Sequence, residues 1–123
     1  MILLLFFLFA WKHFLADFVF QTPYQYRNKG IYGHLGGIQH ASYHSLGTFM
    51  VLALCQIPLP FGWLTIFSLL DGVVHYHIDW LKVNIQQRYK WENPDSKPFW
   101  ILFGIDSFLH YTTYILIIAS INP

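Results

Sequence analysis

The chain has 123 residues, of which 55% are hydrophobic, 20% aromatic and only 11% charged, whereas an average soluble domain has about 25% charged residues. The composition therefore favours a membrane protein with a single domain over residues 1–123, and it leaves little chain for a separate soluble module. A formal net charge of +1 gives no reason to expect nucleic acid as a partner, and the single cysteine, Cys55, excludes an internal disulfide.

Four apolar stretches follow one another along the chain, and each is close to the roughly 20 residues that a helix needs to cross a bilayer. The first stretch opens the sequence without a basic segment or a small-residue cleavage site, and it contains His13 and Asp17. We therefore expect it to be a retained span rather than a signal peptide. The predicted fold is all-α, an integral membrane four-helix bundle with spans at about residues 2–20, 38–57, 61–81 and 99–121.

The connections between these stretches indicate how the bundle is oriented. Residues 21–37 and 82–98 are long and polar, whereas Pro58, Leu59 and Pro60 leave room for only a tight hairpin. Because successive spans alternate in direction, the two long connections must lie on the same side of the membrane. Six of the seven Lys and Arg residues lie in or next to them, so the positive-inside rule predicts cytoplasmic loops and both termini outside the cytoplasm.

Each predicted span carries two ionisable residues separated by four positions, and these pairs form the candidate site. Residues at i and i+4 lie on one face of a helix, stacked about 6 Å apart. With the alternating topology, all four pairs fall in the cytoplasmic half of the bundle, where they can point at a common centre. The pairs are His13 and Asp17, His40 and His44, His75 and Asp79, and Asp106 and His110.

The free-energy cost of placing these ionisable side chains in apolar helices favours a bound metal. An ionisable residue near the centre of a spanning helix costs roughly 2.5–3.5 kcal/mol unless it pairs, binds a metal or lines a watery cavity. Imidazole and carboxylate ligands without thiolate suit zinc, iron or manganese better than copper(I). Eight ligands exceed the four of one tetrahedral zinc ion, so we expect either two ions or one ion with an outer shell of histidines and carboxylates. Zinc is the first expectation, with iron or manganese as alternatives.

Five further polar residues lie in or near the spans. Asp71 either extends the site or bonds to a neighbouring hydroxyl group. His77 faces away from the proposed centre, which favours a hydrogen-bonding or interface role, and His34 is expected to be solvated in a glycine-rich loop. Gln21 continues the face of the first pair and is a candidate for orienting a ligand or substrate. Lys82, at the cytoplasmic border, either binds a phosphate head group or extends to the membrane surface as an ordinary lysine.

In combination and order, these motifs resemble a known family. Residues 12–21, His40 and His44, residues 75–82 and residues 106–110 together are similar to small bacterial and phage membrane proteins, the family known as domain of unknown function 3307. The resemblance covers nearly the whole chain and implies a bacterial inner-membrane location. The chain is also similar, more distantly, to membrane-bound metal-dependent hydrolases, and by that analogy it is expected to be a hydrolase.

The predicted reaction is attack on a lipid ester or phosphoester, near the cytoplasmic leaflet, by water that a divalent metal has acidified. The histidines are expected to be ligands, while Asp17, Asp79 and Asp106 are the candidate catalytic residues, as bridging groups or as a general base. The expected partners are membrane lipids and a lipid-like substrate.

Other functions fit parts of the pattern. Aspartates and histidines in membrane helices also form ion pathways and proton relays, and a small bundle of this kind can form a homo-oligomer around one. A metal can also staple short helices together without catalysis. A di-iron desaturase-like enzyme is disfavoured because the chain lacks adjacent histidines. The polar groups crowd toward one half of the bundle, which favours a one-sided site over a transport path.

Overall fold

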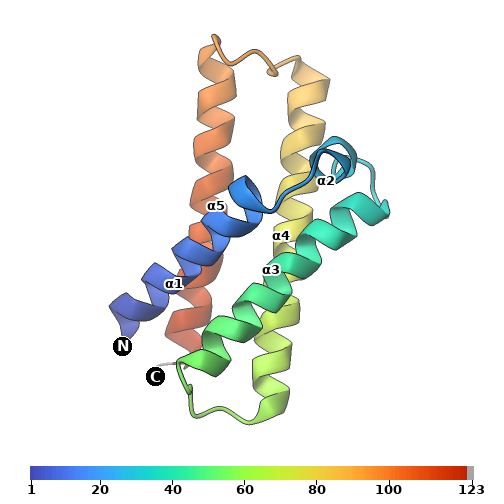
Figure 1. Cartoon of the computed structure of the whole chain (residues 1–123). Coiled ribbons are helices and arrows are strands. Elements are labelled where there is room, and N and C mark those ends of the chain that lie inside the picture. Colours follow the sequence, from blue (N-terminus) through green and yellow to red (C-terminus); the bar gives the residue numbers. More distant parts are fainter. Residues whose placement is uncertain (122–123) are drawn as a thin grey trace.

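The computed structural model describes residues 1–121, which form helices joined by short connections and contain no β-strand (Figure 1). The expectation of an all-α fold is confirmed for these residues. In chain order the elements are α1 Ile2–Phe14, the π-helical turn η1 Leu15–Val19, α2 Pro23–Asn28, α3 Leu35–Leu54, α4 Phe61–Tyr89 and α5 Lys97–Ile121.

The four long helices pack side by side. Helix α3 contacts α1 and α4, and α5 also contacts both α1 and α4. Figure 1 shows the start of α1, the end of α5 and the α3–α4 connection at one end of the molecule, with α2 and the α4–α5 connection at the other. The two polar connections therefore share one end, as helices that alternate in direction require.

Helix α4 is longer than the apolar pattern predicts, and residues 82–89 are helical rather than part of a loop. The helix ends at Lys90, which has a left-handed backbone conformation and donates its N–H to the Gln86 carbonyl. Side chains beyond the apolar stretch still find partners: Val83 packs against Gly30, and the Asn84 side chain donates to the Gly30 carbonyl. These contacts with the segment before α3 extend α4 where hydropathy alone ends it.

The segment between α1 and α3 also contains a helix, α2, which the sequence analysis placed in a loop. Pro23 lies in its first turn, where its missing N–H costs nothing. Thr22 and Gln25 form a capping box, since the Gln25 N–H donates to the Thr22 hydroxyl and the Thr22 N–H donates to the Gln25 side chain. Gln25 is buried, so this cap fixes α2 against the rest of the protein.

Helices α3 and α4 approach each other closely at Gly72. A Cβ atom at this position would collide with Ser45 Oγ and would lie 3.0 Å from the Ala41 carbonyl oxygen. The glycine therefore lets the two backbones approach, as small residues do in helix pairs that pack in membranes. This close crossing places the polar faces of α3 and α4 against each other one turn further along.

A compact apolar core fills the end of the molecule that holds the start of α1 and the end of α5. Its members come from α1, α3, the α3–α4 connection and α5, and the Tyr114 ring stacks on Phe9 at 5.2 Å between centroids. The core residues are Leu5, Phe9, Val51, Leu52, Ile57, Tyr114, Ile117, Ile118 and Ile121.

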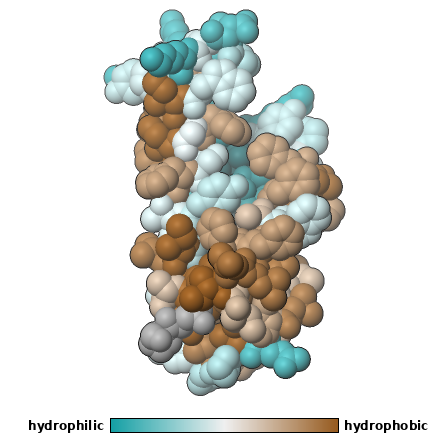
Figure 2. Space-filling view, turned by 90° about the vertical axis from the view of Figure 1, so that its left-hand side faces the viewer, coloured by the Kyte–Doolittle hydropathy of each residue, from teal (hydrophilic) through white to brown (hydrophobic). Residues whose placement is uncertain are grey.

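Much of the outer surface is also apolar. Leu3, Leu54 and Phe61 are each more than two-thirds exposed, and Figure 2 shows hydrophobic side chains covering most of the lower part of this face, with hydrophilic ones gathered at the top. Two stretches, Ile2–Val19 and Lys97–Ile121, are long and apolar enough to cross a membrane. The expectation of four spans is therefore met by length and composition for two helices, and it stays a prediction for α3 and α4.

We expect Gly72→Ala to lower the unfolding temperature of the detergent-solubilised protein, because the new methyl group forces α3 and α4 apart. Gly104→Ala in α5 is the matched control, since nothing lies within 4 Å of its Cβ position and alanine is the better helix former. Thermal unfolding followed by circular dichroism measures both. Equal unfolding temperatures for the two variants would contradict the close crossing.

Candidate metal centre

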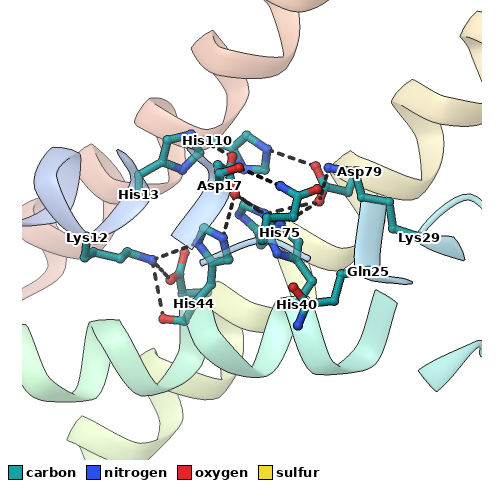
Figure 3. Close-up of polar contacts among 12 residues, drawn as sticks. Lys12, His13, Asp17, Gln25, Lys29, His40, His44, His75, Asp79 and His110 are labelled. Atoms are coloured by element: carbon teal, nitrogen blue, oxygen red, sulfur yellow. Dashed lines mark hydrogen bonds and ion pairs between the residues drawn. The ribbon is translucent and has the colours of Figure 1, made fainter. Parts of the chain in front are cut away.

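All eight residues of the predicted pairs converge in the middle of the molecule, and Figure 3 labels all of them except Asp106. They form three overlapping groups, and within each group one ligand atom per residue lies within 4.8 Å of the others. The groups are the His-rich set Asp17, His40, His44 and His75; the histidine set His13, His75 and His110; and the acid-rich set Asp79, Asp106 and His110.

The π-helical turn η1 positions the only carboxylate of the His-rich set. In this turn the Phe20 N–H donates to the Leu15 carbonyl five residues earlier, which is the π-helical pattern and is common at functional sites. The wider turn carries Asp17 in its middle. Its Oδ2 atom lies 3.2 Å from His13 Nε2, and its Oδ1 atom points at the histidines of α3.

The His-rich set has the spacing of a tetrahedral metal site. Asp17 Oδ1 lies 3.1 Å, 2.9 Å and 3.6 Å from the Nε2 atoms of His40, His44 and His75, and the His40 and His75 Nε2 atoms are 3.2 Å apart. Four ligand atoms about 2.0 Å from one zinc ion are separated from each other by about 3.3 Å. The three ring nitrogens and the carboxylate oxygen therefore fit one ion without rearrangement of the helices.

The acid-rich set adjoins it. His110 Nε2 lies 3.6 Å from Asp79 Oδ1 and 3.4 Å from Asp106 Oδ1. The other oxygen of Asp79 lies 3.2 Å from His40 Nε2 and 3.3 Å from His75 Nε2. Asp79 therefore contacts both sets with different oxygens, in the position that a bridging carboxylate takes between two ions.

Four side-chain atoms of the cluster are buried without a hydrogen-bond partner among the described residues: His110 Nε2, Asp106 Oδ1, and the Nδ1 atoms of His40 and His75. Nearly all buried polar atoms in proteins are hydrogen-bonded, so each exception needs an explanation. His110 Nε2 and Asp106 Oδ1 lie 3.4 Å apart, so one cation bound between them would satisfy the lone pairs of both atoms.

Tyr114 orients His13. Its hydroxyl lies 2.8 Å from His13 Nδ1, and both side chains are buried. A partner at Nδ1 fixes the ring of a ligating histidine and leaves Nε2 directed at the ion. The sequence analysis missed Tyr114. It lies four residues beyond His110, and this spacing places both residues on the same face of one helix.

Three lysines also enter the site, and two of them were not predicted. Lys12 forms an ion pair with Asp71 and lies 3.4 Å from His44 Nδ1. Lys29 Nζ lies 3.1 Å from Asp79 Oδ2. The sequence signal for Lys12 was a cation inside an apolar stretch, but nothing near Lys29 in the sequence indicates a partner 50 positions away.

The third lysine, Lys82, does not fit the ordinary surface lysine of the two roles expected for it, while the phosphate-binding role stays a prediction. Its Nζ atom lies 3.0 Å from Asp106 Oδ2, so in the structure it pairs with a candidate ligand rather than extending to the surface. Gln21 differs from its expected role, because its side chain donates to the Asp17 carbonyl at 2.8 Å. It thereby stabilises the end of η1 and does not point into the site.

The remaining predicted residues lie outside the cluster. Asp71 accepts from the Thr48 hydroxyl at 2.6 Å, so the hydroxyl alternative holds, with the unforeseen addition of Lys12. His77 is exposed and lies 3.2 Å from the Tyr32 hydroxyl. His34 is half-buried rather than solvated, because its side chain caps α3 by accepting from the Gly36 N–H.

Lys29 is held as a cation. Burial alone would lower the pKa of its ammonium group, but the negative charges of Asp79 and Asp17 outweigh burial and raise the pKa above its usual value. A permanently charged lysine on Asp79 neutralises this carboxylate from outside the cluster and leaves its other oxygen free to face His110.

The comparisons with known proteins identify a family. The family described as a protein of unknown function, DUF3307, matches residues 3–123. The resemblance stated from the motifs is thereby confirmed over nearly the whole chain, while the more distant similarity to hydrolases stays a prediction. No curated protein and no solved structure matches the chain.

We expect Lys12→Met to destabilise the protein by about 3–5 kcal/mol, because it leaves Asp71 as an unpaired buried charge. The double variant Lys12→Met, Asp71→Leu removes both charges and should recover a large part of this loss. Denaturant unfolding in detergent gives both free energies. A double variant no more stable than the single one would argue against the ion pair.

Proposed function

The chain belongs to the DUF3307 family, and we propose that it is a membrane-embedded metal-binding protein that hydrolyses a lipid ester or phosphoester near the cytoplasmic leaflet. One observation carries the proposal: imidazole and carboxylate groups from five separate elements converge on one buried point with the spacing of metal ligands. Assembling so many ionisable groups in an apolar interior is costly unless a cation holds them.

The proposed setting is a four-helix bundle in a bacterial inner membrane. The exposed apolar side chains and the two long apolar helices support this setting. Five Lys and Arg residues lie at the end of the molecule that carries α2 and the α4–α5 connection, and under the positive-inside rule that end faces the cytoplasm. They are Arg27, Lys29, Arg88, Lys90 and Lys97.

The proposed centre holds two divalent ions, with Asp79 between them. The His-rich set suits zinc, because three imidazoles and one carboxylate make a tetrahedral shell. The acid-rich set offers more oxygen and suits manganese or iron as well as zinc. A single ion in the His-rich set, with the acid-rich set as its outer shell, is the simpler form of the same proposal.

The chemistry follows from these ligands. A bound divalent cation brings the pKa of water near 7, so that hydroxide is available at neutral pH. Because the His-rich set already offers one ion four protein ligands, the attacking water would lie at the acid-rich set, whose three ligands leave a position open. Asp17 is the least buried of the candidate carboxylates, and in the proposal its Oδ2 atom, which does not face the α3 histidines, takes the proton of that water. The water oxygen bonds to the phosphorus or carbonyl carbon, the bond to the alcohol oxygen breaks, and the departing alcohol takes up a proton.

An ion or proton path is the main alternative, and the fold argues against it. The apolar core of Leu5, Phe9, Leu52 and Tyr114 lies directly beside the cluster, and each of these side chains is 0% exposed. Among the described residues, the buried core at that end contains one polar group, the Tyr114 hydroxyl. The near-complete burial of the histidines favours a second alternative, in which the metal only holds the helices together. An assay for hydrolysis distinguishes this alternative from the proposed hydrolase.

The proposal predicts one or two equivalents of zinc, iron or manganese in the detergent-purified protein. The double variant His44→Ala, Asp79→Ala should lose them, because it removes one ligand from the His-rich set and the carboxylate between the two sets. His77→Ala is the control, since His77 is exposed and away from the cluster. Elemental analysis measures all three, and a wild-type protein without metal after reconstitution would rule the proposal out.

The hydrolase is tested separately. Metal-loaded protein in mixed micelles should release alcohol from lipid esters or phosphoesters, stop when a chelator removes the metal, and recover when metal is returned. Asp17→Asn should lower the rate roughly a hundredfold, the usual contribution of a general base, with metal content followed in parallel. If metal-loaded protein is inactive on both substrate classes, the non-catalytic staple becomes the better explanation.

A further inference from the structure

The polar cluster is buried unevenly, and its most exposed members are Asp17, Lys29 and Lys82. The side chains of His40, His44 and His75 are at most 1% exposed, whereas Lys29 and Lys82 are 13% and 15% exposed. Figure 2 shows a hollow with hydrophilic side chains at its floor, in the part of the molecule above the apolar core. Lys29 and Lys82 contact the acid-rich set directly and are more exposed than its carboxylates, and we call this pair the lysine rim.

The lysine rim is fixed in place by the acid-rich set itself. Lys29 donates to Asp79 Oδ2 and Lys82 donates to Asp106 Oδ2, and the opposite oxygens of these carboxylates face His110. An ammonium group has three N–H donors, and each of these lysines makes one hydrogen bond within the described residues. Donors therefore remain for an acceptor that lies over the acid-rich set.

The net charge of the metal-loaded site indicates which kind of hydrogen-bond acceptor the two lysines would bind. Four carboxylates, those of Asp17, Asp71, Asp79 and Asp106, face three ammonium groups, those of Lys12, Lys29 and Lys82. With the histidines neutral as metal ligands, these side chains carry one negative charge, so the two divalent ions of the proposed centre make the site positive by three, and a metal-bound hydroxide still leaves an excess of two positive charges. A buried positive excess needs an anion, and a neutral carboxylic ester does not supply one. A phosphate monoester carries about −1.5 to −2 charges at pH 7.

We propose that the lysine rim, Lys29 and Lys82, binds the phosphoryl group of a phosphate monoester over the acid-rich set, which narrows the substrate class to phosphomonoesters. This inference rests on the metal centre of the proposed function. The rim lysines act as point charges on the phosphoryl oxygens, as lysines do at phosphate sites. The bond that breaks joins phosphorus to the alcohol oxygen, water supplies the oxygen that replaces it, and the products are the alcohol and inorganic phosphate.

The first test is binding of inorganic phosphate to the metal-loaded full-length protein, measured by isothermal titration calorimetry. We expect saturable binding by the wild type, and Kd values at least about tenfold weaker for Lys29→Met and for Lys82→Met, because each loses one charge-assisted contact. Lys90→Met is the matched control, since it removes one lysine from the exposed end of α4 and should bind phosphate like the wild type. Elemental analysis of each protein confirms equal metal content.

The outcomes separate the two proposals. Wild-type protein that contains no metal overturns the metal centre and this inference with it. Metal-loaded wild type that does not bind phosphate overturns the inference alone, and so does equal binding by wild type and both rim variants. Because failure of the metal-loaded wild type to bind phosphate is enough to overturn the inference, the test remains valid even if one variant folds poorly.

A second arm identifies the source of the phosphoryl group. Mixed micelles with phosphatidic acid present a lipid phosphomonoester, and micelles with phosphatidylcholine present a lipid phosphodiester. Competition with inorganic phosphate by phosphatidic acid, but not by phosphatidylcholine, supports a lipid phosphomonoester. Competition by neither supports a soluble phosphomonoester, and equal competition by both overturns the choice of class.

Discussion

The structure depends on compensating buried carboxylates. Asp71, Asp79 and Asp106 are each paired with a lysine that comes from a different helix or connection, and Asp17 is surrounded by histidines. Removing either partner of such a pair leaves an uncompensated charge in an apolar interior, which costs far more than the pair contributes. Each ion pair therefore specifies which elements must be neighbours, while the apolar side chains around it tolerate other arrangements.

Along the helices, the interior consists of an apolar layer and a polar layer, which stabilise the fold in different ways. The apolar core at the end with the termini supplies non-directional packing from α1, α3 and α5. The polar layer above it supplies direction, because its contacts form only when all four long helices and η1 are in register. Because the apolar core occupies only the end with the termini, the polar layer has a packed apolar layer on one side and the polar connections of the chain on the other.

The sequence predicts the polar layer better than its surroundings, for a physical reason. Helical periodicity makes i, i+4 partners share a face, so pairs such as His40 and His44 are visible without a structure. Lys12 and Lys29 reach carboxylates 59 and 50 positions away, and no local pattern encodes such distances. The extension of α4 was missed for the same reason, since the Asn84 contact with Gly30 is tertiary. The capping box of α2, by contrast, is a local pattern, and the spacing of Thr22 and Gln25 indicates it from the sequence alone.

Because of the π-helical turn at Asp17, the gain or loss of a single residue in the first apolar stretch would change the directions in which its side chains point. A π-helical turn accommodates one more residue than an α-helical turn over the same rise. A lineage that lost one residue between Leu15 and Phe20 would close the turn into regular α-helix and rotate everything before it relative to everything after it. His13 and Asp17 would then no longer face the same neighbours. Insertions and deletions in this stretch are therefore expected to be rarer among relatives than substitutions of its exposed apolar side chains, such as Phe18.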